Sequence, residues 1–207
     1  MKLTKAHREA LRDILTWRRD VRHFRPDPVA PDVLERLRAA MDLAPSVGNS
    51  RPWRVRQVES PALRAQVCAI FEAANHAAAA IYDDTTRAAY DALKLAGLRE
   101  APVHLAVFTD TAPEAGHGLG RQTMPETLAF STVSAIHTLW LAARAENIGL
   151  GWVSILDPAA ICAALDVPDD WQLTGYLCLG HPAETDDTPL LHRVGWQENA
   201  PTDWKVL

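Results

Sequence analysis

Residues 18–22 read Arg-Arg-Asp-Val-Arg, so three guanidinium groups and one carboxylate fall within five positions. Arginine suits phosphate recognition because its planar group donates two parallel hydrogen bonds and keeps its charge when partly dehydrated. Asp20 partly neutralises such a cluster, which is a cost for a site that only holds an anion. The pattern therefore indicates either a solvated helix end with ordinary ion pairs or an anion site in which Asp20 takes part in chemistry.

Two other segments carry residues of the kind that border ligands. Residues 45–50, Pro-Ser-Val-Gly-Asn-Ser, can offer short hydrogen-bonding groups to a phosphate or a planar heterocycle. Residues 149–154 contain two glycines, which let a backbone come close to a ligand. They are not a dinucleotide-binding fingerprint, because no strand-glycine-helix order surrounds them. Each segment taken alone is equally compatible with an ordinary connection.

The composition predicts a globular protein with one domain, residues 1–207, since 48% of the residues are hydrophobic and 23% are charged. The net charge of −5 argues against a nucleic-acid-binding protein. The arginines are nevertheless concentrated, with 11 of 17 between Arg8 and Arg56, which favours a site for a small anion.

Other functional classes lack support. No apolar run is long enough to span a membrane and no signal peptide is apparent, so we expect a cytoplasmic protein. The three cysteines and eight histidines show no metal-ligand spacing, so neither a metal nor a disulfide framework is predicted. The serines lack the context of a hydrolase nucleophile.

The elements that must position these segments follow from hydropathy periodicity. Helices are expected at residues 5–16, 31–43, 61–80, 125–147 and 158–165. Strands are expected at residues 54–59, 103–108, 151–155 and 172–180. Because helices and strands mix without a regular βαβ order, the pattern favours the α+β class.

Three segments carry further expectations. The helix at 125–147 is apolar around nearly its whole circumference, so it should be buried in the core or in a subunit interface, with His137 in the interior. The charged stretch 82–100 resembles a mobile surface helix. The tail 183–207 carries Trp196 and Trp204, so we expect it to pack on another surface, such as a second subunit.

The three polar segments together resemble, in order and spacing, the flavin-binding elements of the nitroreductase superfamily. Within it, the chain is similar to the 5,6-dimethylbenzimidazole synthases, and the resemblance spans roughly residues 5–182. The matching stretches are Arg18–Arg22, Ala44–Gly48 with Pro52-Trp53, Leu93–Pro102, Ser131–Arg144 and Gly149–Leu156. The most specific are Leu93–Pro102 and the Gly-Trp-Val-Ser-Ile-Leu run.

The resemblance implies a fold and a reaction. The fold is a mixed central sheet flanked by helices in a domain-swapped homodimer, with FMN at each subunit interface. Reduced FMN is then a substrate as well as a cofactor, which O2 fragments to 5,6-dimethylbenzimidazole, the lower ligand of cobalamin, and erythrose 4-phosphate. A flavin reductase is the implied partner that supplies reduced FMN.

The resemblance also implies roles for individual residues. Asp20 and Ser154 are the implied catalytic pair, and Ser46 is implied to reach the flavin from the partner subunit. The arginines would hold the phosphate and the pyrimidine edge, and stretch 82–100 would be a lid. The full implied flavin-binding set is Arg18, Arg19, Asp20, Val21, Arg22, Pro45, Ser46, Asn49, Lys94, Leu95 and Ser154.

Two departures keep other readings open. Residues 48–51 are closer to general nitroreductases, and residues 195–199 lack the arginines expected after Gly-Trp. The sequence leaves open whether one phosphate-binding arginine is missing or Arg193 replaces it. The alternatives are an NAD(P)H-dependent nitroreductase or flavin reductase that keeps its FMN, and a flavin-storage or sensor protein without turnover.

Overall fold

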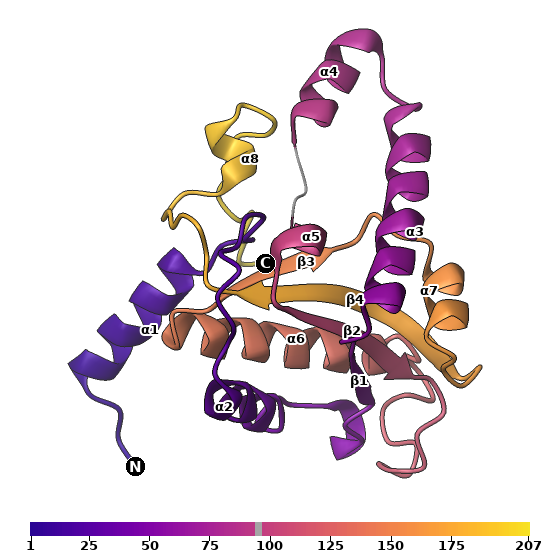
Figure 1. Cartoon of the computed structure of the whole chain (residues 1–207). Coiled ribbons are helices and arrows are strands. Elements are labelled where there is room, and N and C mark those ends of the chain that lie inside the picture. Colours follow the sequence, from indigo (N-terminus) through magenta and orange to yellow (C-terminus); the bar gives the residue numbers. More distant parts are fainter. Residues whose placement is uncertain (94–96) are drawn as a thin grey trace.

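The computed structural model describes residues 1–93 and 97–207 (Figure 1). Its helices are α1 (Lys5–Trp17), α2 (Pro31–Met41), α3 (Pro61–Ala79), α4 (Asp84–Ala92), α5 (Gly97–Glu100), α6 (Thr127–Ala145), α7 (Pro158–Ala164) and α8 (Leu190–Arg193), with a 3-10 turn η1 (Val47–Asn49). Its strands are β1 (Trp53–Gln57), β2 (Val103–Asp110), β3 (Gly149–Val153) and β4 (Trp171–Gly180).

The four strands form one sheet in the order β1-β2-β4-β3, and each neighbouring pair is antiparallel. This arrangement of sheet and helices confirms the predicted α+β class. The mixed character expected of the sheet is limited, within the described residues, to one isolated parallel bridge between Asp20 and Leu150. That bridge attaches the segment after α1 to the sheet edge formed by β3.

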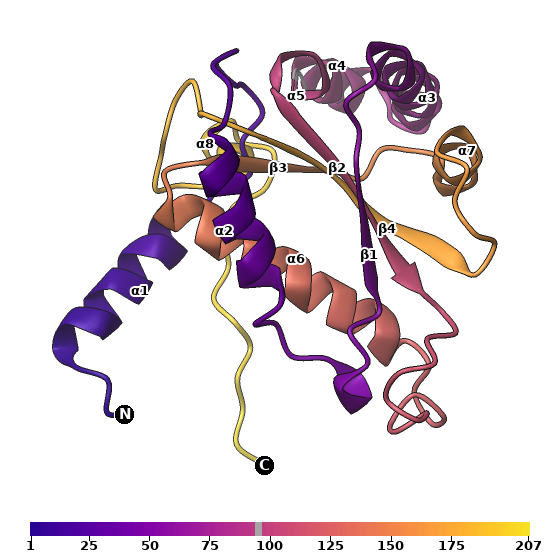
Figure 2. The ribbon, with the colours of Figure 1, turned by 60° about the horizontal axis from the view of Figure 1, so that its bottom comes forward.

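Helices cover both faces of the sheet (Figure 2). On one face, Leu37 of α2 and Leu139 of α6 belong to a buried cluster with sheet residues. On the other face, Val67 of α3 and Ile161 of α7 pack with Phe108 of β2. The sheet is therefore the middle layer between two hydrophobic cores, which holds its edge strand β3 in a fixed position.

Several helix starts follow directly from sequence signals. Pro61 and Pro158 each occupy the first turn, where the missing N–H of proline costs nothing. The side chain of Asp157 accepts hydrogen bonds from the backbone N–H groups of Ala159 and Ala160, which caps α7.

Three expectations need correction or refinement. His137 is exposed and not interior, and its face of α6 also leaves Phe130 56% exposed. The described parts of stretch 82–100 contain α4 and α5, and Leu98 of α5 is buried at 5% exposure, so this stretch is not all surface. The ring of Trp196 packs on its own chain, while Trp204 remains 86% exposed.

In the part of the chain that the structure describes, none of the helices combines the length and the apolar character needed to cross a membrane.

His104 of β2 is a buried titratable group. Its Nδ1 lies 3.0 Å from the Tyr176 hydroxyl, and both side chains are fully buried. Burial, and to a smaller extent the positive charge of Arg64, lower the pKa of His104 to about 4. The folded protein therefore holds His104 neutral at pH values where a free histidine would take up a proton.

Folding stability should fall as the pH drops from about 6.5 to about 4, because His104 is then protonated in the unfolded chain but stays neutral in the folded chain. We expect a loss of about 2 kcal/mol in unfolding free energy between roughly pH 7 and pH 5 from this group. His104→Asn keeps a polar group near Tyr176 but cannot take up this proton. The variant should therefore lose less unfolding free energy than wild type between pH 7 and pH 5. Urea denaturation at both pH values measures this, and equal losses would contradict it.

Candidate active site

The segment that carries Asp20 lies against β3. The Val21 N–H donates to the Leu150 carbonyl at 3.1 Å, and the Trp152 N–H donates to Oδ1 of Asp20 at 3.0 Å. Backbone groups of a strand therefore fix both the main chain and the carboxylate of this segment. The carboxylate is held at the sheet edge although its side chain is 39% exposed.

Gly149 and Gly151 make this close approach possible. A Cβ at Gly149 would lie 2.9 Å from Cγ2 of Val21, and a Cβ at Gly151 would collide with the Val21 carbonyl oxygen. The sequence predicted that this glycine pair would admit a ligand. In the structure, the glycines admit residues 18–22 of the same chain, so they position the arginine segment.

Asp20 and Arg22 form an ion pair in which the guanidinium of Arg22 is incompletely hydrogen-bonded. Nε of Arg22 donates to Oδ2 of Asp20 at 3.3 Å. The Arg22 side chain is only 14% exposed, and its Nη1 is buried without a hydrogen-bond partner among the described residues. A buried guanidinium nitrogen without an acceptor is costly, and an acceptor on a bound anion would relieve that cost.

Arg18 has a similar environment. Its guanidinium lies over the Trp140 ring at 4.6 Å, and its Nε is buried without a partner in the described part of the chain. Burial is the main cause that lowers the pKa of Arg18, and the neighbouring charge of Arg19 adds to it. Both effects favour binding of an anion, which would relieve the repulsion between the two cations.

Two adjoining hollows share Asp20, Val21 and Arg22. The first, of about 650 Å³, is bordered by the arginines of residues 18–22, by Trp140 and Arg144 of α6, and by Asp186 and Arg193 of the tail. The second, of about 520 Å³, extends along β3 to Ser154 and Cys178. A third hollow of about 500 Å³ shares Arg22 and Ile155 with the second and reaches α4.

The structure thus brings Asp20 and Ser154 to one hollow, together with Val21 and Arg22. Ser154 follows β3 directly and is exposed. Arg18, Arg19 and Arg22 border the first hollow as a group. Lys94 and Leu95, which were predicted to touch the flavin from the lid, lie outside the described residues.

Pro45, Ser46 and Asn49 do not border these three hollows. Figures 1 and 2 both place η1 at the opposite end of the molecule from α8, which borders the first hollow. Within one chain, the predicted site residues therefore form two separate groups.

The loop at residues 44–52 is internally fixed. The Arg51 N–H donates to Oγ of Ser46 at 3.0 Å, and the Val47 N–H donates to Oγ of Ser131 at 3.0 Å. Gly48 faces Gly116 at close range, and both have positive φ angles of 56° and 82°, which a side chain would strain. The loop is therefore rigid without any contact to the hollows.

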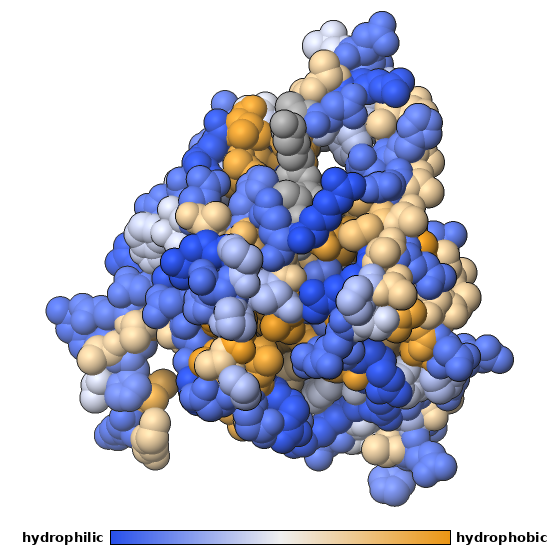
Figure 3. Space-filling view, in the orientation of Figure 1, coloured by the Kyte–Doolittle hydropathy of each residue, from blue (hydrophilic) through white to orange (hydrophobic). Residues whose placement is uncertain are grey.

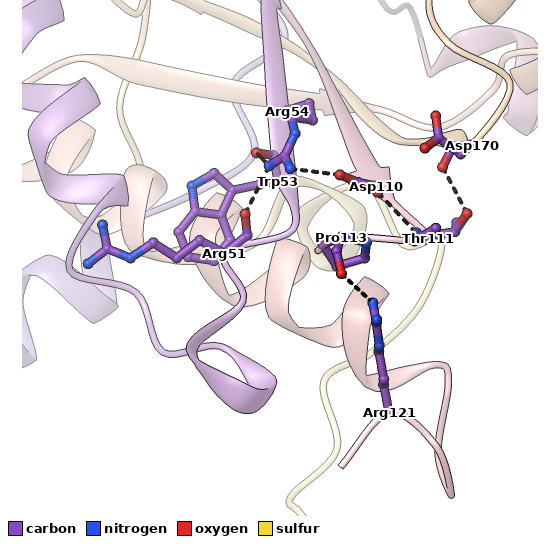
Figure 4. Close-up of polar contacts among 9 residues, drawn as sticks. Arg51, Trp53, Arg54, Asp110, Thr111, Pro113, Arg121 and Asp170 are labelled. Atoms are coloured by element: carbon purple, nitrogen blue, oxygen red, sulfur yellow. Dashed lines mark hydrogen bonds and ion pairs between the residues drawn. The ribbon is translucent and has the colours of Figure 1, made fainter. Parts of the chain in front are cut away.

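An ion pair that the sequence did not reveal supports this second group (Figure 4). Arg54 donates to Asp110 at 2.7 Å, and the Asp110 side chain is only 11% exposed. The same guanidinium donates to the carbonyl oxygens of Arg51 and Trp53 at 3.0 Å. Residues far apart in sequence form this contact, so spacing along the chain carried no signal for it.

Other residues at the hollows were also missed. Trp140 supports Arg18 by its ring and donates from Nε1 to the Arg19 carbonyl at 3.3 Å. His23, which borders the first hollow, has its Nδ1 3.5 Å from Glu100, a residue outside the hollows that also accepts from the Phe24 N–H at 2.9 Å. Trp140 looked like any apolar residue of its helix, so only the fold distinguishes it.

A sequence profile described as the nitroreductase family matches residues 15–181, and the chain belongs to this family. It is 61% identical over 205 residues to a 5,6-dimethylbenzimidazole synthase of Rhodobacter capsulatus, a match that covers 99% of both chains. A synthase of the same name from Rhodospirillum rubrum is 54% identical over 194 residues, 94% of this chain and 92% of that one. The resemblance found in the sequence is therefore confirmed.

The fold has a solved counterpart. A crystal structure of iodotyrosine deiodinase bound to FMN and 3-iodo-L-tyrosine matches with a TM-score of 0.74 at 20% identity, over 95% of this chain and 97% of that one. At this level of identity the match establishes the common fold alone.

Gly151→Ala should detach residues 18–22 from β3, because the new methyl group would collide with the Val21 carbonyl. We expect a loss of about 1–3 kcal/mol in unfolding free energy. Ser154→Ala, at an exposed position of the same hollow, is the matched control and should stay within about 0.5 kcal/mol of wild type. Urea denaturation measures both, and an unchanged Gly151→Ala variant would show that the close approach is unimportant.

Proposed function

We propose that this chain is a 5,6-dimethylbenzimidazole synthase that uses O2 to fragment reduced FMN, with erythrose 4-phosphate as the second product. The observation that carries the proposal is the identity of 61% over nearly the whole chain to the Rhodobacter capsulatus synthase. The presence of a carboxylate, Asp20, among the arginines of the hollow supports it. In this proposal the protein acts in the cytoplasm, where a flavin reductase supplies reduced FMN.

The arginine hollow fits the phosphate and the polar edge of FMN. Arg18 and Arg22 each hold a buried nitrogen for which no described residue provides an acceptor, and Arg19 adds a third positive charge at the same hollow. Arg193 also borders this hollow, where it pairs with Asp186 at 3.1 Å. We infer that Arg193 supplies the cation that residues 195–199 lack.

Bound reduced FMN supplies the electrons that react with O2. The protein's part is to hold polar groups where protons must move. Asp20 is suited to exchange a proton at Oδ2, because Oδ1 is fixed by the Trp152 N–H and the carboxylate stays partly exposed. The Ser154 hydroxyl lies on the same hollow and can hydrogen-bond a ligand there. Nε of Arg22 lies 3.3 Å from Oδ2 of Asp20 and so helps to orient the carboxylate.

The separation of the two residue groups supports a homodimer with shared sites. The loop that carries Ser46 is rigid but distant from the hollows of its own chain. Apolar side chains remain exposed on two helices, among them Leu11 and Leu15 of α1 and Phe130 and Val133 of α6. In this proposal a second copy covers these faces, brings its Ser46 loop to the flavin and packs against the part of the tail 183–207 beyond Trp196, where Trp204 is exposed.

Stoichiometry tests the proposed reaction. The protein is incubated with chemically reduced FMN in air, and the products are identified by mass spectrometry. The proposal expects 5,6-dimethylbenzimidazole in proportion to the FMN consumed. Catalytic NADH oxidation with FMN intact would instead identify a nitroreductase or flavin reductase. Tight FMN binding without product would identify a storage or sensor protein.

Asp20→Asn should lower benzimidazole formation by about 100-fold or more, because the amide cannot exchange the proton that the carboxylate does. The variant keeps an oxygen for the Trp152 N–H, so FMN binding should remain close to that of wild type. Product yield and FMN binding by fluorescence quenching measure the two effects. A variant with full yield would exclude Asp20 from the chemistry.

Mixing two inactive variants should restore activity if each site combines Asp20 of one chain with Ser46 of the other. Asp20→Asn and Ser46→Ala chains are unfolded and refolded together, and in half of the dimers one of the two sites then has both native residues. We expect about a quarter of the wild-type rate. Each variant refolded alone is the control. A mixture no more active than its components would place both residues in the site of a single chain.

A further inference from the structure

The tail segment between Asp186 and Trp196 contacts the arginine hollow at its first end. Nε of Arg19 donates to the Asp187 carbonyl at 2.9 Å, and Arg193 of α8 pairs with Asp186 at 3.1 Å. Leu190 of α8 also borders this hollow. The position of the segment therefore depends on the same arginines that are proposed to hold the phosphate of FMN.

The other end of this segment contacts α4. Gly195 has a φ of +72°, so the chain reverses after α8, and the Trp196 N–H donates to the Leu191 carbonyl at 2.9 Å. The indole ring then packs edge-on against Tyr82, with ring centroids 5.9 Å apart and planes at 89°. Its centroid lies 6.4 Å from that of Tyr90. Edge-to-face packing of this kind is favourable because ring edges are positive and ring faces negative.

These rings link the tail to α3 and α4. Tyr82 and Tyr90 lie 5.2 Å apart, and the Tyr90 hydroxyl donates to Oδ1 of Asn75 on α3 at 2.7 Å. Figure 3 shows an apolar patch over α8, and Val194 and Trp196 border a surface hollow together with Thr85 and Ala89 of α4. Most other side chains of α4 are exposed, so the aromatic cluster is a principal attachment of this helix among the described residues.

Tyr90 also borders the third hollow, which it shares with Arg22 and Ile155. One ring therefore contacts Trp196 on one side and the hollow beside Arg22 on the other. Trp196 itself does not border any of the three hollows, so it acts on them only through Tyr90 and α4.

We propose that Trp196 is a positioning residue that holds α4 beside the Arg22 end of the hollows, and that an anion at the arginines strengthens this hold through residues 186–196. The second part rests on the proposed function, because FMN is the anion. Binding at one end of the tail segment then orders the helix at its other end, in agreement with the general link between ligand binding and local unfolding.

Hydrogen-deuterium exchange of the whole protein, followed by mass spectrometry of peptides that cover residues 84–92, tests the proposal without turnover. Without ligand, Trp196→Ala should exchange about tenfold faster in this region than wild type. Trp196→Phe keeps an aromatic edge for Tyr82 and should restore most of the protection. Trp171→Phe, a change of the same type at the far end of β4, is the matched control and should leave this region unchanged.

Oxidised FMN provides the second comparison. It should slow exchange of residues 84–92 in wild type and have a much smaller effect in Trp196→Ala. Equal exchange of wild type and Trp196→Ala without ligand would overturn the proposal, as would equal protection by FMN in both or no protection in wild type. These readouts need no product, so a protein that fails to form benzimidazole can still show the linkage, and an active synthase can still lack it.

Discussion

The contact between residues 18–22 and β3 is the constraint on which the site depends. Strand residues satisfy the Val21 N–H and Oδ1 of Asp20, so the segment that would otherwise be a helix end becomes an extension of the sheet edge. The contact exists because Gly149 and Gly151 leave no Cβ in the way. Since β3 is held by β4 inside a three-layer body, the carboxylate inherits the rigidity of the sheet, which a loop alone would not supply.

As a consequence, the carboxylate and the guanidinium groups of residues 18–22 differ in their exposure to solvent. Asp20 keeps access to solvent, whereas the Arg22 side chain is mostly buried and Arg18 is half-buried, each with a buried nitrogen that the described residues leave without an acceptor. Two incompletely satisfied cations outweigh one exposed carboxylate, so the hollow remains attractive to an anion although Asp20 lies within it. The fold therefore reduces the electrostatic cost of Asp20, because water still solvates the carboxylate while one nitrogen each of Arg18 and Arg22 is buried.

Local patterns predicted much of the fold. Pro61 and Pro158 start helices where expected, and apolar periodicity located each of the four strands. The predicted group Arg18, Arg19, Asp20 and Arg22 lies at one site because it is contiguous in sequence. The role of the glycines was less accessible, since a pattern cannot tell whether close approach serves a ligand or another part of the chain. The sequence also could not predict the contact of Arg18 with Trp140 or the ion pair of Arg54 with Asp110. Each contact joins residues from different elements that are far apart in sequence.

The position of the Ser46 loop was equally inaccessible from the sequence, because it depends on how the whole chain folds. Its internal hydrogen bonds to Ser131 and Arg51 fix its shape within one chain, yet that shape serves none of the hollows of that chain. A rigid polar loop with left-handed residues such as Asn49 and Arg51 is strained, and strain of this kind persists where the surrounding structure requires it. In the proposed homodimer this loop would bring Ser46 to the hollows of the other copy, so each complete site would need residues from both chains.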